Sequence, residues 1–381
     1  MGPLSGIKVV EFAGIGPGPF CCMLLADMGA QVIRIDRADR VGKDVMEPRF
    51  NTLLRNRKNI AIDLKSEEGR NVAMRLCEWG DILIEGFRPG VMERLGLGPD
   101  DLFARNKAII YGRMTGWGQD GPMAQRAGHD INYIALSGAL HAIGTRESGP
   151  VPPLNLVGDF GGGALYLVMG VLAAYIEARQ SGSGQVVDAA MVEGAASLLC
   201  SGFGARARGV WKEERQSNML DGGSHFYGTY ETSDGEHVGI GPIEPQFYAE
   251  FIDKLGLDTS SLPKQMDRGA WSEMRERVAA VFRTKTRDEW DRKFAESDAC
   301  VAPVMRMSEA IEHPHNVARG SFVEIEGVVQ PGPAPKFSRT QTEMPNSCAF
   351  VGEHTREVLS DLGLSDAEIA SLSDLGAVRQ A

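Results

Sequence analysis

The sequence predicts an α/β protein with a parallel sheet, followed by a second and smaller region of hairpin and helices. Short β-branched apolar runs alternate with amphipathic helical runs through the first half of the chain, as they do in a parallel sheet with helical crossovers. The 381 residues exceed the usual size of one hydrophobic core. Beyond residue 226 the alternation gives way to short strands and helices.

The predicted elements follow in order. Strands are expected where β-branched apolar runs occur, at residues 7–12, 31–36, 59–64, 81–87, 108–114 and within 178–188. Helices are expected at residues 20–30, 67–80 and 160–176. The last of these runs is uncharged but short of a membrane span, which predicts a buried helix. The later sequence predicts a hairpin over residues 227–241 and helices over 245–257, 271–284 and 352–376.

These patterns also divide the chain. Residues 1–190 form the predicted larger domain, residues 191–225 a Gly- and Arg-rich linker, and residues 226–310 the smaller domain. A net charge of −11 at pH 7 argues against nucleic acid or an anionic membrane as a general partner. The six cysteines form no C-x-x-C pair and no zinc spacing, and no signal-peptide pattern precedes them. We therefore expect reduced thiols and a cytoplasmic protein.

A glycine-rich turn, "EFAGIGPGPF", follows the first predicted strand. Gly14-x-Gly16, with Asp36 downstream, is similar to the start of a dinucleotide fingerprint. However, Pro19 stands where the third Gly or Ala belongs, and proline lacks the N–H group that would cradle a pyrophosphate. The stretch therefore predicts a rigid strand-to-helix turn near some ligand, and not a redox dinucleotide site.

Basic side chains gather between residues 34 and 65 of this acidic chain, at or between predicted strand ends, where α/β sheets bind ligands. Guanidinium and ammonium groups there suit phosphates. From composition alone, a solvated surface is an equal alternative. The members are Arg34, Arg37, Arg40, Arg49, Arg55, Arg57, Lys58 and Lys65, and Arg88 ends another predicted strand.

Four positions carry groups suited to proton transfer. His129 and Asp130 stand side by side at the start of a helical run, which stabilises a carboxylate and favours a neutral imidazole. Asp159 precedes three glycines, and Glu244 precedes Pro245. Each carboxylate is also explained as the first residue of a helix, and spacing alone favours a structural histidine.

Taken together, the motifs carry a resemblance to a known family. "GIGPGPF", "LADMGAQVIRIDR", "LIEGFRPGVMERLGLGP", "YGRMTGWGQDGP", "AGHDINY", "PLNLVGDFGGG", "GQVVDAAMVEG", "NMLDGG" and "IEPQFY" occur in this order over nearly the whole chain. The sequence closely resembles the α-methylacyl-CoA racemases of the class III CoA-transferase superfamily. The resemblance implies a Rossmann-like larger domain completed by residues 320–381, a smaller α+β domain and an interlocked homodimer. It implies no metal and no redox cofactor, since the acyl-CoA thioester is the substrate.

The resemblance also implies roles for individual residues. His129 and Asp159 match the family's two acid/base groups, and Glu244 matches the glutamate that hydrogen-bonds the histidine. One departure is Pro242, where the family usually has Ala, and it bears on the aim of Glu244. The positions that match CoA- or substrate-binding segments are Arg37, Ile62, Asp63, Leu64, Lys65, Gly86, Arg88, Gly128, Asp130, Ile131, Asn132 and Tyr133.

The implied reaction interconverts (R)- and (S)-2-methylacyl-CoA thioesters. An α-proton leaves one face and a proton returns to the other through an enolate, so two groups exchange acid and base roles. Backbone N–H groups near Asp130 are candidate donors to the enolate oxygen. A helix N-terminus would keep Asp159 ionised, whereas burial or the charge of Glu244 would oppose that. Candidates for an adaptable acyl surface, with core packing as the alternative, are Met169, Met191 and Met219.

Two other functions stay open. A class III CoA-transferase would use Asp159 as a nucleophile that forms an acyl anhydride. Such transferases lack the histidine of "AGHDINY" and the glutamate of "IEPQFY", so His129 and Glu244 favour the racemase. A non-catalytic acyl-CoA binding protein would need the basic residues but no acid/base pair.

Overall fold

The computed structural model describes residues 2–381, which form two compact units. The first unit contains the residues up to Ser137, Leu154–Leu198 and Pro314–Ala381, and the second contains Gly138–Pro153 and Leu199–His313. The predicted linker at 191–225 needs correction, because α8 (Met191–Leu198) belongs to the first unit and α9 (Cys200–Ala207) to the second. The small residues that weaken the helical pattern there serve close packing: Gly194 leaves room for the backbone of Gly162.

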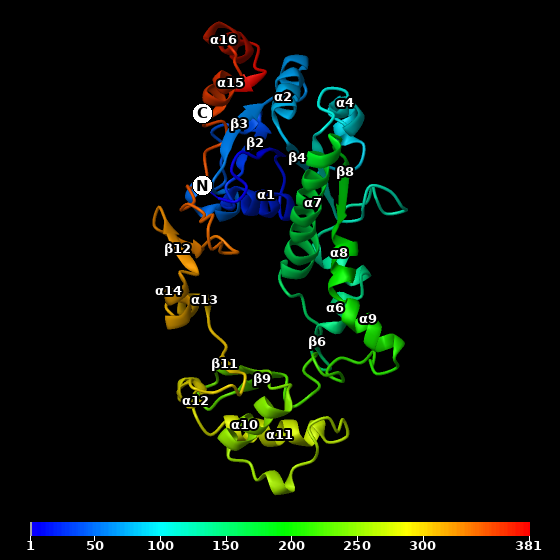
Figure 1. Ribbon diagram of the computed structural model, residues 1–381, viewed down its shortest axis with the longest axis vertical. Coiled ribbons are helices and arrows are strands. Elements are labelled where there is room, and N and C mark those ends of the chain that lie inside the picture. Colours follow the sequence, from blue (N-terminus) through cyan, green and yellow to red (C-terminus); the bar gives the residue numbers. More distant parts are fainter. Residues whose placement is uncertain (1) are drawn as a thin grey trace. The chain divides into compact units, whose positions relative to one another are not determined.

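A seven-stranded sheet forms the centre of the first unit (Figure 1). Its strands run parallel except for the edge strand β14, which is the last strand in the chain. The predicted α/β class is confirmed. In sheet order the strands are β14 (Val378–Arg379), β3 (Lys58–Ile62), β2 (Gln31–Arg37), β1 (Lys8–Phe12), β4 (Ile82–Glu85), β5 (Ile110–Thr115) and β8 (Val186–Ala190). The chain moves outward from β1 to β3, then crosses to β4 on the other side of β1. The carboxyl-terminal strand β14 is antiparallel to β3 and was not predicted, since two residues carry no strand pattern.

Helices cover both faces of this sheet, because successive strand residues point to opposite faces. Val9 packs with α1 (Pro17–Asp27) and α7 (Leu165–Ser181) on one face. Val10 packs with α2 (Glu67–Trp79) on the other, where helix α15 (Thr355–Asp361) also lies beside β3 (Figure 1). The remaining α-helices of this unit are α3 (Val91–Arg94), α4 (Pro99–Phe103), α5 (Asp130–Leu136), α14 (Pro314–Arg319), α15 (Thr355–Asp361) and α16 (Asp366–Asp374), and a hairpin joins β12 (Phe322–Ile325) to β13 (Val328–Pro331).

The long apolar run continues upstream of α7 as η4 (Leu156–Ala164), a π-helix. The stretch Leu156–Ser181 is long and apolar enough to cross a membrane. About a third of the residues in its most apolar part are buried inside the first unit, and the others are not. The predicted buried helix is therefore correct for one face only. Leu167 and Val171 lie in the core, whereas Leu165, Met169 and Ile176 are exposed. These three exposed residues lie on one side of the helix, at spacings of four and seven residues, and are called the α7 apolar face below.

Three arginines of the predicted basic patch are internal, and most of its other members are exposed. Arg34 and Arg57 are buried and share the carboxylate of Glu11 on β1, at 2.6 and 3.0 Å. Arg55 is buried against Asp27, at 2.5 Å. A buried guanidinium requires such a partner. These three arginines therefore serve the fold, and they are not available to a ligand phosphate.

The second unit has a three-stranded antiparallel sheet in the order β11-β10-β9. The predicted hairpin is confirmed, with five residues between β9 (Gly228–Glu231) and β10 (His237–Ile240). The other elements are β11 (Val301–Pro303), the short pair β6 (Gly144–Thr145) and β7 (Gly149–Pro150), and the helices α6 (Ala139–Ala142), α10 (Pro245–Leu255), α11 (Trp271–Phe282), α12 (Arg287–Phe294) and α13 (Met307–Ala310). Aromatic side chains dominate its core, including Phe251, Phe282 and Trp290.

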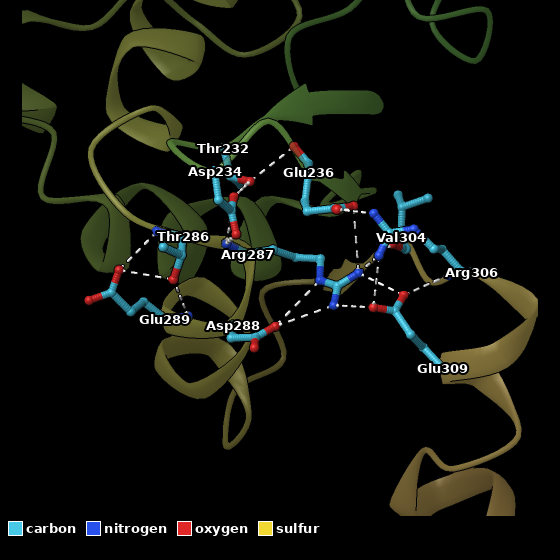
Figure 2. A network of polar contacts seen from close by, with 10 residues as sticks. All are labelled: Thr232, Asp234, Glu236, Thr286, Arg287, Asp288, Glu289, Val304, Arg306 and Glu309. Carbon is cyan, nitrogen blue, oxygen red and sulfur yellow. Dashed lines mark hydrogen bonds and ion pairs between the residues drawn. The ribbon is translucent and has the colours of Figure 1, made fainter.

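A network around Arg287 ties the edge of this sheet to α12 and α13 (Figure 2). The Arg287 guanidinium donates to both carboxylate oxygens of Glu309, at 2.9 and 2.8 Å, and to the carbonyl of Val304 at 3.2 Å. Hydrogen bonds from Arg287 lower the pKa of Glu309 to about 2. Arg306 pairs with Glu236 in the hairpin loop. The chain leaving β11 is thus fixed before it returns to the first unit at Pro314.

Candidate active site

The first unit has a cleft of about 560 Å³ at the carboxyl ends of its central strands. The strand order reverses between β1 and β4, which is where open α/β sheets bind ligands. We call this hollow the His129 cleft. Its lining includes Gly14, Ile15, Gly16, Pro17, Glu85, Gly86, Phe87, Arg88, Met114, Trp117, Arg126, Gly128, His129, Tyr133, Asp159 and Met191.

His129 immediately precedes α5 and is exposed in the first unit. Its backbone N–H donates to Asn132 Oδ1 at 3.0 Å, so the side chain of Asn132 closes the start of the helix. Asn132 and Ile131 are exposed themselves. Among residues 2–381, none accepts a hydrogen bond from the N–H groups of Asp130 and Ile131, the first two of the helix.

Asp159 shares the His129 cleft with His129, as the sequence predicts. It is the fourth residue of the π-helix η4 and lies in its first turn, so the expected influence of a helix end, which favours the ionised form, still acts on it. Burial raises the pKa of Asp159, a hydrogen bond from Asn155 at 3.2 Å lowers it, the charge of Asp130 raises it and that of His129 lowers it. The net direction is upward, which makes Asp159 easier to protonate. Asn155 is a site residue that sequence reasoning missed.

The glycines around Asp159 are explained by close packing. Gly16 has φ +67°, and a Cβ there would lie 2.9 Å from Asp159 Oδ2. The turn after β1 therefore places bare backbone against the carboxylate. In contrast, Gly162 faces the backbone of α8, where a Cβ would lie 2.5 Å from the nitrogen of Ala195. The sequence suggested space for substrate beside the three glycines, but at Gly162 the backbone of α8 fills that space.

Asp130 does more than begin a helix. It is buried, and its Oδ1 accepts a hydrogen bond from the backbone N–H of Asp159 at 2.7 Å. Tyr133, one turn further, is also buried and meets Trp117 edge-on, with ring centroids 4.7 Å apart. Gly128 lies directly against the Tyr133 ring, since a Cβ there would be 2.7 Å from it. α5 thus fixes His129 and Asp159 from one element.

Gly86 and Arg88 line the cleft from the turn after β4, as predicted, and both are exposed. The residue before them, Glu85, was not predicted. It is buried, accepts the N–H of Phe87 at 2.7 Å and pairs with Arg113 at 3.1 Å. Burial outweighs these contacts and raises the pKa of Glu85 to about 7. The sequence does not reveal this residue, because a glutamate at the end of a predicted strand is normally exposed and nothing in the pattern indicates that Glu85 is buried.

A second cavity, of about 710 Å³, gathers several of the predicted CoA-binding residues. We call it the Lys65 cleft. Arg37, Asp63, Leu64 and Lys65 line it, and Phe87 lines both clefts. Arg379 of β14 adds a third basic side chain that the sequence did not indicate, because the fold alone brings the carboxyl terminus to β3. Ile62 does not line the cleft, and its side chain is fully buried in the core beside β3.

Glu244 belongs to the second unit, where it precedes α10 and is exposed. Its side chain makes no hydrogen bond to the start of the helix, so the explanation as a simple cap is wrong. The backbone before it is held by Gln265, whose Nε2 donates to the carbonyls of Pro242 and Ile243 at 3.0 and 2.9 Å. Pro242 therefore sits in a defined turn that leaves the Glu244 carboxylate free.

Comparison with known proteins agrees with this architecture. The sequence profile of CoA-transferase family III matches residues 4–355. The chain belongs to CoA-transferase family III. It is 47% identical over 372 residues to "Alpha-methylacyl-CoA racemase" of Mus musculus, which covers 97% of this chain and 96% of the relative. The protein of the same name from Homo sapiens is 46% identical over 373 residues, with the same coverage.

A solved structure supports the fold of this family member. The "CAIB/BAIF family protein from Brucella suis" superposes with a TM-score of 0.82 at 24% identity, covering 95% of this chain and 99% of that one. In this CoA-transferase family III chain, the structure brings His129, Asp159, Gly86, Arg88, Gly128 and Tyr133 to one cleft and Arg37, Asp63, Leu64 and Lys65 to the other. Met191 is buried and lines the His129 cleft, Met169 lies on the α7 apolar face, and Met219 belongs to the second unit.

Gly16→Ala should lower the free energy of unfolding by about 1–3 kcal/mol, because alanine is strained at φ +67° and its Cβ meets the Asp159 carboxylate. Urea unfolding followed by circular dichroism measures this. Gly14→Ala is the matched control in the same turn, since its Cβ would have no neighbour nearer than 4.0 Å. Equal stability of the two variants would contradict the assigned role of Gly16.

Proposed function

We propose that this protein is a racemase that interconverts (R)- and (S)-2-methylacyl-CoA thioesters. One observation carries the proposal: His129 and Asp159 line one cleft, and burial favours the protonated form of Asp159. A base and an acid in one cleft suit a reaction that removes and returns a proton at the same carbon. The relatives named alpha-methylacyl-CoA racemase support it.

The thioester carbonyl acidifies the α-carbon enough for a side-chain base. In one direction neutral His129 takes the α-proton, and protonated Asp159 gives its proton to the opposite face of the enolate. In the other direction ionised Asp159 takes the proton and the imidazolium of His129 returns one. Each direction forms one C–H bond and breaks one. The thioester and the two side chains supply this chemistry, so we propose that no metal or redox cofactor takes part.

The enolate oxygen needs hydrogen-bond donors as its charge develops. The free N–H groups of Asp130 and Ile131 at the start of α5 are suited to this, and the dipole of the helix adds to them. Both follow His129 directly in the chain, so an oxygen held there keeps the α-carbon near the imidazole. We propose that Glu244 orients that imidazole and stabilises its cation, as the family resemblance implies.

We propose that the Lys65 cleft holds the phosphates of CoA. Arg37, Lys65 and Arg379 line it, and exposed guanidinium and ammonium groups bind phosphate oxygens well. Phe87 lines this cleft and the His129 cleft, so a thioester arm from one can reach the other past its ring. Met191 offers an adaptable apolar surface to the acyl chain in the His129 cleft.

Incubation of a single enantiomer of a 2-methylacyl-CoA in D₂O tests the activity. We expect inversion together with one α-deuterium per turnover, followed by NMR. His129→Ala and Asp159→Ala should each lower the rate by at least about 10²-fold, since each removes a positioned acid or base. Absence of α-exchange with the wild-type protein would reject the racemase. Transfer of CoA to an added carboxylate without exchange would indicate the transferase, with Asp159 as nucleophile.

Arg37→Ala and Lys65→Ala should each raise KM about tenfold with little change in kcat, because each loses a charge-assisted hydrogen bond to a phosphate far from the reacting carbon. Initial-rate kinetics measures this. Lys58→Ala is the control: Lys58 pairs with Glu357 and Asp361 at 2.9 and 3.0 Å and lines a separate cavity. A KM that rises as much in Lys58→Ala would mean that general surface charge, and not the Lys65 cleft, attracts CoA.

We also propose a homodimer in which the α7 apolar face is covered. Leu165, Met169 and Ile176 expose 49, 60 and 61% of their surface in the single chain, and such a row favours a protein partner. Sedimentation equilibrium should give about twice the chain mass of 41.2 kDa. The double variant Met169→Asp, Ile176→Asp should shift the mass toward one chain, whereas Glu177→Gln on the same helix should not. A single-chain mass for the wild type would contradict the dimer.

A further inference from the structure

The Asp130 carboxylate crosses from α5 to the π-helix η4. Its Oδ1 accepts the Asp159 N–H at 2.7 Å, and a Cβ on Gly158 would lie only 2.4 Å from that oxygen. The backbone of residues 158–159 therefore rests directly on the carboxylate. A residue with a Cβ atom at position 158 would not allow the carboxylate to come this close to the backbone, so glycine is required there. The contact joins the two elements that carry the proposed acid/base pair, since His129 immediately precedes α5 and Asp159 lies in η4.

The second oxygen of the same carboxylate is unusual. Asp130 Oδ2 is buried and has no hydrogen-bond partner within residues 2–381. A buried carboxylate oxygen without a donor has no hydrogen bond that would offset a negative charge on it, so a second negative charge nearby becomes more costly. The nearest ionisable group joined to Asp130 by a hydrogen bond is Asp159, through its backbone. This geometry places an uncompensated charge beside the residue that must alternate between acid and base.

Other groups face Asp159 as well. From the side of α5, His129 and Tyr133 interact with it, and Asn155 donates to it from the segment before η4. α1 begins behind Gly16, which has no charge, and α8 contributes the apolar Met191 to the cleft. The remaining ionisable lining of the His129 cleft is Glu85, Arg88 and Arg126. Among the described residues that interact with the Asp159 carboxyl, Asp130 is the one anion.

We propose that Asp130 is a positioning residue, which holds the Asp159 backbone in place and through its charge keeps the Asp159 carboxyl able to carry a proton. This inference rests on the proposed racemase. In the enolate intermediate His129 and Asp159 both carry a proton, since one has just arrived and the other is about to leave. Asp130 therefore stabilises an intermediate that both directions of the reaction share.

The test compares variants by the pH dependence of kcat/KM. When His129 and Asp159 are both protonated no base is present, so the acid limb of the profile follows the pKa of Asp159. Asp130→Asn keeps an acceptor for the Asp159 N–H but removes the charge. The acid limb should move to lower pH. At neutral pH, kcat/KM should fall about tenfold, and equally in both directions of the reaction. A tenfold loss is only part of the rate factor that a positioned acid contributes. Asp130→Ala removes the acceptor as well and should lose more.

Asn155→Leu should have the opposite effect on the pKa of Asp159 and is the matched comparison for Asp130→Asn. It removes a donor that lowers the pKa of Asp159, so its acid limb should move to higher pH. Glu193→Gln, an exposed carboxylate on α8, should leave the profile unchanged. Glu85 is present in every variant, so differences between profiles report Asp159. Circular dichroism checks the fold, and Asp130→Ser repeats the measurement if Asp130→Asn does not fold.

The outcomes separate the two proposals. Absence of α-exchange in the wild type rejects the racemase itself. An active wild type whose acid limb coincides with that of Asp130→Asn overturns the role of Asp130 and leaves the racemase standing. A loss in Asp130→Asn without movement of the limb would assign Asp130 a purely structural role, and it would also overturn the inference.

Discussion

The His129 cleft depends on the point where the strand order of the sheet reverses, between β1 and β4. β2 and β4 flank β1, so the chain segments that leave the carboxyl ends of β1 and β4 turn away from each other and leave a hollow between them. The turn that holds Gly16 follows β1, and the turn that holds Phe87 follows β4. α5 and η4 then close the hollow from segments after β5. No helix in the first unit could supply this arrangement alone, because the reactive side chains are separated by long stretches of chain.

The sheet itself depends on a buried charge. Glu11 on β1 is fully buried and is balanced by Arg34 from β2 and Arg57 from the segment before β3. Such a cluster is costly to bury and is tolerated only when its partners are all in place. It also determines which basic side chains remain for a ligand. Arg37 and Lys65 are left at the surface, at the carboxyl ends of β2 and β3, and the Lys65 cleft forms between them.

Local patterns were sufficient for most elements of the fold. The strands of the sheet other than β14, the hairpin at residues 228–240 and helices α1, α2, α10 and α11 all occur near their predicted residues. Contacts between distant residues were not accessible in this way. Nothing in the sequence near Arg55 reveals that Asp27 is its partner, and the Gly and Ala residues of α8 looked like a linker because their packing partner, Gly162, lies 32 residues upstream. The two proposed acid/base positions came from family resemblance, since spacing alone favoured structural roles.

The protonation state of Asp159 illustrates the same limit more sharply. The sequence offers a helix end that would keep this carboxylate ionised, with burial or Glu244 as the opposing influence. The structure places Asp159 in the first turn of η4, and burial, the largest cause, nevertheless raises its pKa. It adds Asp130, which the sequence places next to His129 and which the fold turns toward Asp159. A residue that seemed to serve its own helix therefore acts on the opposite element. Since its charge acts on Asp159 and its backbone N–H is free beside His129, one residue connects the two proposed acid/base groups and the proposed site of the enolate oxygen.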